Sequence, residues 1–140
     1  MSGPPRRVRV VTDSTSDIPR ALASSLGLEV VPLSVRFGDE SFLDGVELSP
    51  SQFLDRLRAA NDLPKTSQPP TTAFAAAFRR ALDAGEDVLC VTIASGLSGT
   101  HNAARLAAEA TDADRVRVLD SGTVTMRLGW AAVEAARAAR

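Results

Sequence analysis

The sequence predicts an α/β fold, in which a layered sheet of mainly parallel strands is flanked by helices. Short β-branched, apolar segments alternate with alanine-rich, helix-prone segments along the chain. Such segments are typical of strands buried on both faces of a parallel sheet. In addition, the 140 residues are 44% hydrophobic and 24% charged, a composition typical of one globular domain. We therefore expect a single domain with its ligand loops at the carboxyl ends of the strands.

The chain is expected to begin with a strand followed by a helix. Four of the six residues 7–12 are β-branched, which predicts the strand. The polar residues that follow favour a loop and then a helix over residues 18–26. Ser16 or Asp17 can accept hydrogen bonds at the start of this helix, and Gly27 can end it.

A β-hairpin is expected next. Residues 28–31 and 33–37 favour extended segments that Pro32 separates. The turn at residues 38–40 then leads into another extended segment over residues 41–46. Because proline cannot donate a ladder hydrogen bond, we expect this hairpin at an edge of the sheet.

A helix with a capping box should follow the hairpin. Ser49 can accept a hydrogen bond from the Gln52 amide while the Gln52 side chain reaches back, and Pro50 suits the first helical position. This helix should end near Ala60. Three prolines within residues 61–70 forbid a regular helix there, so we expect a stiff loop.

The second half of the chain continues the alternation of helices and strands. Thr71 or Thr72 can cap the first of these helices, and Gly85 can close it. The elements expected are a helix over residues 73–84, a strand over 87–93, a helix over 100–110, a strand over 115–119 and a helix over 126–140.

Three of the predicted strands end in turns rich in hydroxyl groups, at residues 12–16, 95–100 and 120–123. In a parallel sheet these turns converge on one edge. In the second turn, Gly96 and Gly99 let the backbone present its amides, and the helix that follows contributes the positive end of its dipole. The arrangement predicts an anion-binding site, although each turn taken singly is also typical of helix capping.

Several other functions are disfavoured by the sequence. The second turn lacks both the lysine of a P-loop and the Gly-x-Gly-x-x-Gly spacing, so ATP is not expected. His101 follows Ser98 by three residues at a helix start, which disfavours a hydrolase and makes His101 a surface or capping residue. One histidine and one cysteine, the apolar-flanked Cys90, disfavour a metal site. A net charge of −1 disfavours nucleic acid.

Five motifs together resemble the DegV family in their order and spacing. They are Thr12-Asp-Ser-Thr-Ser-Asp-Ile-Pro19, Phe37-Gly-Asp-Glu-Ser41 with Asp44-Gly45, Leu63-Pro-Lys-Thr-Ser-Gln-Pro69, Ser95-Gly-Leu-Ser-Gly-Thr100 and Asp120-Ser121. The resemblance implies a DegV-like N-terminal α/β domain over residues 7–140, preceded by a flexible tail over residues 1–6. The second, C-terminal domain of the family is expected to be absent.

The resemblance also implies a function, that of a fatty-acid carrier in a bacterial fatty acid kinase system. Such a carrier is not an enzyme and needs no cofactor or metal. It holds a long-chain fatty acid, and a separate ATP-dependent kinase phosphorylates the carboxylate to an acyl phosphate for phospholipid synthesis. The residues expected to bind the carboxylate are Thr66, Ser67, Ser95, Ser98 and Gly99, with Asp13, Ser14, Thr100 and Ser121 in supporting loops. The histidine and arginine that the family adds from its C-terminal domain have no counterpart.

A cytoplasmic location is expected, because no apolar run approaches the roughly 18 residues of a membrane span. A homodimer is a further expectation for partners. Two other functions stay open: a binding module for another small anionic metabolite, and an interaction or dimerisation domain. The candidate residues for contact with the fatty-acid tail are Leu33, Phe37, Phe74, Phe78 and Leu97, although core packing is the stronger expectation for each.

Overall fold

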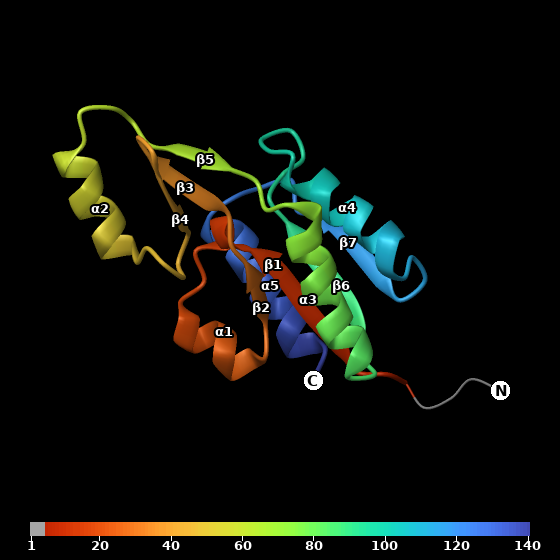
Figure 1. Cartoon of the computed structure of the whole chain (residues 1–140). Coiled ribbons are helices and arrows are strands. Elements are labelled where there is room, and N and C mark those ends of the chain that lie inside the picture. Colours follow the sequence, from red (N-terminus) through yellow and green to blue (C-terminus); the bar gives the residue numbers. More distant parts are fainter. Residues whose placement is uncertain (1–4) are drawn as a thin grey trace.

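A parallel four-stranded sheet forms the centre of the fold in the computed structural model, which describes residues 5–140. The strand order is β2-β1-β6-β7, and each neighbouring pair is parallel (Figure 1). The predicted α/β class is therefore confirmed. The strands are β1 (Val8–Asp13), β2 (Glu29–Val31), β6 (Asp87–Thr92) and β7 (Val116–Asp120).

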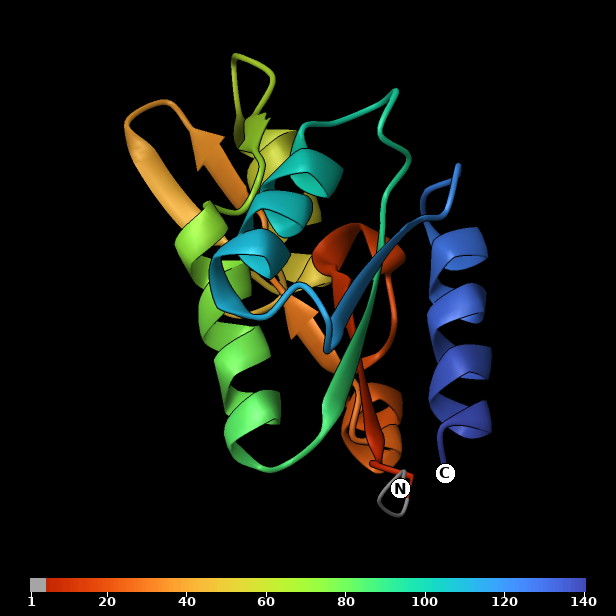
Figure 2. The same ribbon diagram turned by 90° about the vertical axis from the view of Figure 1, so that its right-hand side faces the viewer.

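Helices cover both faces of this sheet. Figure 2 shows α3 and α4 on one side of the sheet and α5 on the other. Phe74 and Phe78 of α3 are fully buried in a cluster with Val11 of β1, while Ala132 of α5 packs with Val10. Burial on both faces explains why the strands are continuous apolar runs in the sequence. The helices are α1 (Arg20–Leu26), α3 (Thr71–Asp83), α4 (Thr100–Thr111) and α5 (Met126–Ala138).

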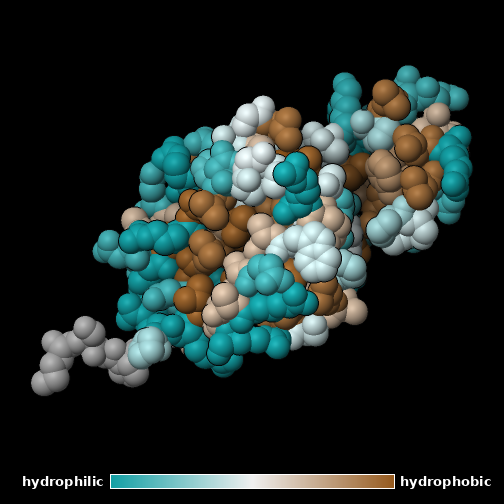
Figure 3. All heavy atoms as spheres, turned by 180° about the vertical axis from the view of Figure 1, so that it is seen from behind, coloured by the Kyte–Doolittle hydropathy of each residue, from teal (hydrophilic) through white to brown (hydrophobic). Residues whose placement is uncertain are grey.

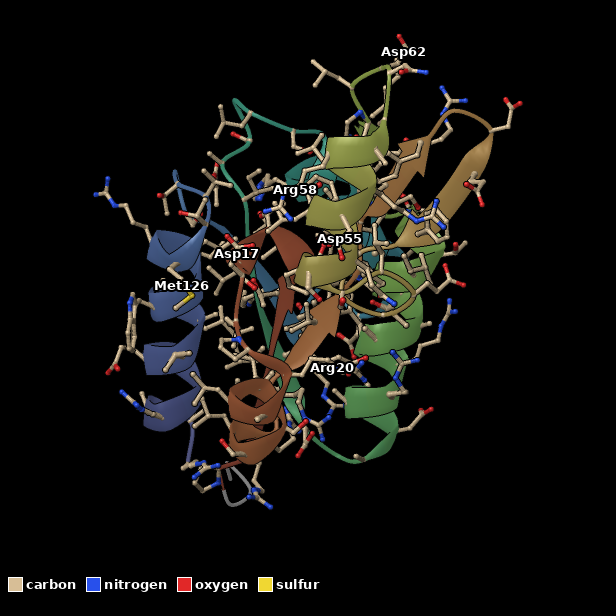
Figure 4. The ribbon with its side chains drawn as sticks, turned by 90° about the vertical axis from the view of Figure 1, so that its left-hand side faces the viewer. Asp17, Arg20, Asp55, Arg58, Asp62 and Met126 are labelled. Carbon is tan, nitrogen blue, oxygen red and sulfur yellow. The ribbon has the colours of Figure 1, made fainter. Side chains whose placement is uncertain are left out.

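A second, antiparallel sheet and one helix project from the body of the molecule. We call these elements, residues 34–67, the lobe; Figures 1 and 3 show it standing out to one side. The strand order is β4-β3-β5. The elements of the lobe are β3 (Ser34–Phe37), β4 (Glu40–Leu43), α2 (Pro50–Ala59) and β5 (Lys65–Ser67).

The lobe corrects two predictions. The hairpin of β3 and β4 is present, but it belongs to the second sheet and does not lie at an edge of the main one. The stiff loop predicted over residues 61–70 contains β5, which pairs with β3. Pro64 and Pro69 flank this strand and hold their neighbours extended, so the same prolines that exclude a helix favour a short strand.

The helix ends are partly as predicted. The capping box of α2 is confirmed, because the Gln52 amide donates to Ser49 Oγ at 3.2 Å and the Ser49 amide donates to Gln52 Oε1 at 2.8 Å. The predicted cap of α1 is wrong: a short 3-10 helix, η1 (Ser14–Ser16), takes up these residues, and Asp17 ends it with a φ of 55°. Helix α1 starts after Pro19, with no side-chain cap.

The predictions for the start of α3 and for the core residues are also partly correct. Helix α3 begins after Pro70 with no side-chain cap, so the predicted caps at Thr71 or Thr72 are wrong. At this helix start the Ala73 amide instead donates to the Pro70 carbonyl oxygen at 2.9 Å. Of the candidates for tail contact, Leu33 is buried like the two phenylalanines of α3, whereas Leu97 is 66% exposed. Core packing is therefore confirmed for Leu33, Phe74 and Phe78.

The amino end of the main sheet is rich in ion pairs. Arg9 pairs with Glu86 at 2.7 Å, and Asp87 pairs with both Arg6 and Arg115 at 2.9 Å. Arg115 and Arg6 hold the pKa of the Asp87 carboxyl below its ordinary value, against the opposing effect of desolvation. Arg6 belongs to the predicted flexible tail, of which residues 1–4 lie outside the described residues. These five charged residues are thus paired within the protein.

Two further features concern predictions from the sequence: the burial of Cys90 and the length and polarity of the helices. Cys90 is fully buried in the core, and burial raises the pKa of its thiol. Within residues 5–140, every helix is too short or too polar to cross a lipid bilayer.

Helix α5 packs closely against η1 through Gly129. A Cβ atom at this position would lie 2.4 Å from the Ser16 carbonyl oxygen, which is too close for any side chain. The glycine therefore lets the end of β1 and its loop approach the helix, despite a helix-propensity cost of about 1 kcal/mol.

Replacing Gly129→Ala should destabilise the fold. Overpacking against the Ser16 carbonyl costs about 1–3 kcal/mol, which exceeds the gain in helix propensity of up to about 1 kcal/mol. Urea unfolding should show a lower midpoint for this variant. The exposed α5 residue Ala131, changed to glycine, calibrates the propensity effect alone. A midpoint for Gly129→Ala above that of the wild type would contradict the close packing.

Candidate functional site

Hydroxyl-rich loops after β1, β6 and β7 meet at the carboxyl edge of the main sheet, as the sequence predicts. Hydrogen bonds join them, and two of these are made by aspartate side chains. The Ile93 amide at the end of β6 donates to Asp13 Oδ2 at 2.8 Å, and the Ser95 amide donates to Asp120 Oδ1 at 3.2 Å. Each bond connects a loop of one strand to the carboxylate of its neighbour. The three loops therefore form one surface.

The loop after β1 is anchored from within. Asp13 is fully buried, and its Oδ1 accepts hydrogen bonds from the Thr15 amide at 2.9 Å and the Thr15 hydroxyl at 2.5 Å. Ser14 Oγ accepts from the Leu33 amide at 3.0 Å, which ties this loop to the chain entering the lobe. Asp13 and Ser14, two of the predicted supporting residues, thus form hydrogen bonds within the protein that hold this loop in place.

The loop after β6 carries two serines in different surroundings. Ser95 is exposed and lies beside Asp120. Ser98 is half-buried, and its Oγ lies 2.9 Å from Thr100 Oγ1 and accepts from the Thr100 amide at 3.2 Å. Thr100 is fully buried at the start of α4. The loop therefore presents one serine next to a carboxylate and another next to a helix start.

Asp120 organises the loop after β7. Its Oδ1 accepts from the Gly122 amide at 2.9 Å, while Ser121 Oγ accepts from the Thr123 amide at 3.2 Å. The Ser95 side chain, together with the amides of Gly122 and Ser95, holds the pKa of the Asp120 carboxyl below its ordinary value. Asp120 is therefore a negative group at one side of the site.

Thr66 and Ser67 lie on β5, which we call the second wall of the candidate site; as successive strand residues, their side chains point to opposite faces of the strand. They pair with Val35 and Ser34 of β3, and both are exposed. Neither hydroxyl forms a hydrogen bond within the part of the chain that the structure describes. These hydroxyls are therefore free to bind a ligand.

Gln68 connects this wall to the loop after β6. A Cβ atom on Gly99 would lie 2.0 Å from Gln68 Oε1, so the carboxamide rests directly on the glycine. The contact brings the segment of Thr66 and Ser67 against the segment of Ser98 and Gly99. Sequence reasoning missed Gln68 as a site residue, although it lies in a motif that predicted its neighbours.

His101 differs from the prediction of a surface or capping residue. It is half-buried, and its Nδ1 lies 3.0 Å from the hydroxyl of the fully buried Thr92 at the end of β6. The histidine therefore joins the first turn of α4 to the end of β6, on either side of the Ser95–Thr100 loop. Residues 5–140 contain no cluster of three or more histidine, cysteine or acidic residues that could hold a metal ion.

A hollow of about 510 Å3 also occurs at the amino end of the sheet, where Arg7, Arg9 and Glu86 line it together with the end of α5. It lies far from the hydroxyl loops, at the opposite end of the strands, and two of its charged groups already pair with each other. Since ligands of open parallel sheets bind at the carboxyl ends of the strands, we place the candidate site among the loops.

Comparison with known proteins places this geometry in a family. The family model described as "Uncharacterised protein, DegV family" matches residues 7–140. The chain belongs to the DegV family. A DegV domain-containing protein from Deinococcus radiodurans is 42% identical over 133 residues, which are 95% of this chain and 47% of that protein. The chain spans about half the length of the curated DegV relatives it matches.

Two solved structures of DegV relatives share the fold. A DegV family protein from Thermus thermophilus, described for its fatty-acid binding, has a TM-score of 0.85 and 37% identity over 94% of this chain and 46% of its own. A stearic-acid-binding protein from Eubacterium ventriosum has a TM-score of 0.86 and 29% identity over 93% of this chain and 46% of its own. Both are similar to this chain over nearly its whole length.

Stability should depend on pH through Asp120. Because its folded pKa lies below the ordinary value of 3.8, the carboxylate contributes stability above that value and loses it as the pH falls through the folded pKa. Asp120→Asn should therefore cost stability near neutral pH, and the difference from wild type should shrink below about pH 3.9. Urea unfolding at several pH values measures this difference. A difference that stays constant or grows in acid would contradict the assigned role.

Proposed function

We propose that this chain forms the head-group half of a fatty-acid site and presents the carboxylate to a separate kinase. The observation that carries the proposal is the contact of Gln68 with Gly99, which sets two hydroxyl walls against each other. The fatty acids named for the Thermus and Eubacterium relatives support the choice of ligand. In this proposal residues 7–140 are the N-terminal domain of a DegV protein, without catalytic residues of their own.

The chemistry of the walls suits a carboxylate that must stay reactive. A carboxylate taken out of water needs hydrogen bonds to offset the cost of desolvation. Hydroxyl groups such as those of Thr66, Ser67 and Ser98 supply such bonds without a full positive charge. The carboxylate would therefore remain a nucleophile for phosphoryl transfer by another protein.

Electrostatics favour Ser98 over Ser95 as the direct contact. Ser95 lies beside the carboxylate of Asp120, whose negative charge repels a second carboxylate. Ser98 and Gly99 lie at the start of α4, where the helix dipole favours negative charge. Thr66 shares a face of the chain with Gln68, which contacts this loop, so we assign the head group to Thr66 and Ser98, with Ser67 and Ser95 at its margin.

The tail would contribute most of the affinity and needs more apolar surface than the loops provide. A tail of about 15 methylenes, each contributing about 0.8 kcal/mol, gives roughly 12 kcal/mol before entropic costs. Such a tail is roughly 20 Å long, against a radius of gyration of about 14 Å for a domain of this size. Exposed Leu97 beside Ser98 is where we expect the tail to leave the head-group site.

Native mass spectrometry of the purified chain with added stearate tests ligand binding. We expect a one-to-one complex, weaker than that of a two-domain relative because much of the tail stays in water. A thermal-shift comparison completes the test, since stearate should stabilise the fold more than a phosphate ester does. Stabilisation by the phosphate ester alone would contradict the proposal and favour another anionic ligand.

The double change Thr66→Ala with Ser98→Ala should separate head-group positioning from tail binding. Because the changed groups lie at the head-group end of the ligand, we expect acyl-phosphate formation by a fatty acid kinase to fall about tenfold or more, with stearate affinity falling less. Kinase turnover with each carrier, alongside its stearate affinity, measures both effects. Ser121→Ala, in a supporting loop, serves as the comparison. Equal turnover by the double variant and wild type would argue against the assigned contacts.

A further inference from the structure

The Gln68 side chain occupies a space between the lobe and the body. Gln68 directly follows β5, and Gly99 directly precedes α4. A Cβ atom on Gly99 would lie 2.0 Å from Gln68 Oε1, 2.9 Å from Cδ and 3.1 Å from Nε2. The whole carboxamide therefore fills the place that a side chain at position 99 would take. Glycine at this position keeps that place open.

The carboxamide keeps its hydrogen-bonding capacity. Gln68 is an exposed residue, and its side chain forms no hydrogen bond to any of residues 5–140. Of its two polar atoms, Oε1 lies nearer to the Cβ position of Gly99, at 2.0 Å, and Nε2 lies farther from it, at 3.1 Å. A carboxamide that contacts the loop and forms no hydrogen bond within residues 5–140 has its donors available for a ligand.

The position of these donors matches the two walls. Thr66 and Ser67 precede Gln68 directly, and Ser98 precedes Gly99 directly. A carboxylate placed between the walls therefore lies beside the carboxamide. It has about four lone-pair sites, and the hydroxyls of Thr66 and Ser98 can donate one hydrogen bond each. The carboxamide adds donors without adding charge.

We propose that Gln68 determines specificity by donating an N–H bond to the bound carboxylate from between the hydroxyl walls. This inference rests on the proposed function, because it concerns the head group of the same ligand. In this proposal Gly99 does not bind the ligand. Its missing side chain leaves the space in which the Gln68 carboxamide lies, and the carboxamide binds the ligand. The residue pair thus selects a carboxylate over an uncharged head group.

Two substitutions at Gln68 separate contact from shape. Gln68→Met keeps the length of the side chain and removes the donors, and Gln68→Glu replaces the donors with a negative charge. Affinities for stearate and for stearyl alcohol, measured by displacement of one fluorescent fatty-acid probe, give the readout. We expect Gln68→Met to weaken stearate about tenfold and stearyl alcohol less than about twofold. Gln68→Glu should weaken stearate further, because like charges repel.

A matched pair of glycine substitutions tests whether the space at Gly99 positions the Gln68 carboxamide. Gly99→Ala places a methyl group where the carboxamide lies, whereas a Cβ on Gly96 in the same loop meets nothing within 4 Å. Gly96→Ala therefore measures the effect of an added methyl group elsewhere in the loop. We expect stearate affinity to be about tenfold lower for Gly99→Ala than for Gly96→Ala, because the donors are displaced.

The outcomes distinguish this inference from the proposed function. If wild type binds neither stearate nor the alcohol, the proposed function fails and the inference fails with it. If wild type binds stearate but Gln68→Met binds it equally well, only the inference fails. Equal losses for acid and alcohol would make Gln68 a packing residue and would also overturn the inference. A loss confined to the acid supports it.

Discussion

The hydrogen bonds of one buried carboxylate, that of Asp13, hold the site together. Asp13 ends β1, is fully buried, and accepts from the Ile93 amide at the end of β6 and from Thr15 in its own loop. A buried carboxylate without such partners would be costly, so these bonds fix both loops relative to each other. At the surface, the Asp120 carboxylate likewise accepts hydrogen bonds from backbone amides and joins the loops after β6 and β7. The carboxyl edge is thereby preorganised without any ligand.

The lobe brings β5 to this edge. Its chain enters at Leu33, whose amide donates to Ser14, and leaves at Gln68, whose side chain rests on Gly99. Two contacts therefore orient β5 toward the loops of the main sheet. The arrangement also separates two chemistries, with ion pairs at the amino end of the strands and hydroxyls at the carboxyl end. In the proposed function, the neutral donors suit a carboxylate that must stay reactive.

The sequence predicted the features that depend on local pattern or on strand direction. The parallel strands, the capping box at Ser49 and the meeting of three hydroxyl loops follow from periodicity and from the rule on strand ends. Strand β5 was missed because prolines on both sides suggested only a loop. The caps of α1 were mistaken because η1 uses the same polar residues. Gln68 and Gly99 are 31 residues apart, and their contact depends on how the lobe sits, which no local pattern encodes.

Intermolecular NOEs between stearate and the labelled protein test the central claim most directly. The account predicts contacts from the C2 methylene protons of the ligand to the methyl group of Thr66 and the β protons of Ser98, since both walls face the head group. Contacts instead to Val8 and Ala136, which line the hollow at the amino end of the sheet, would contradict it.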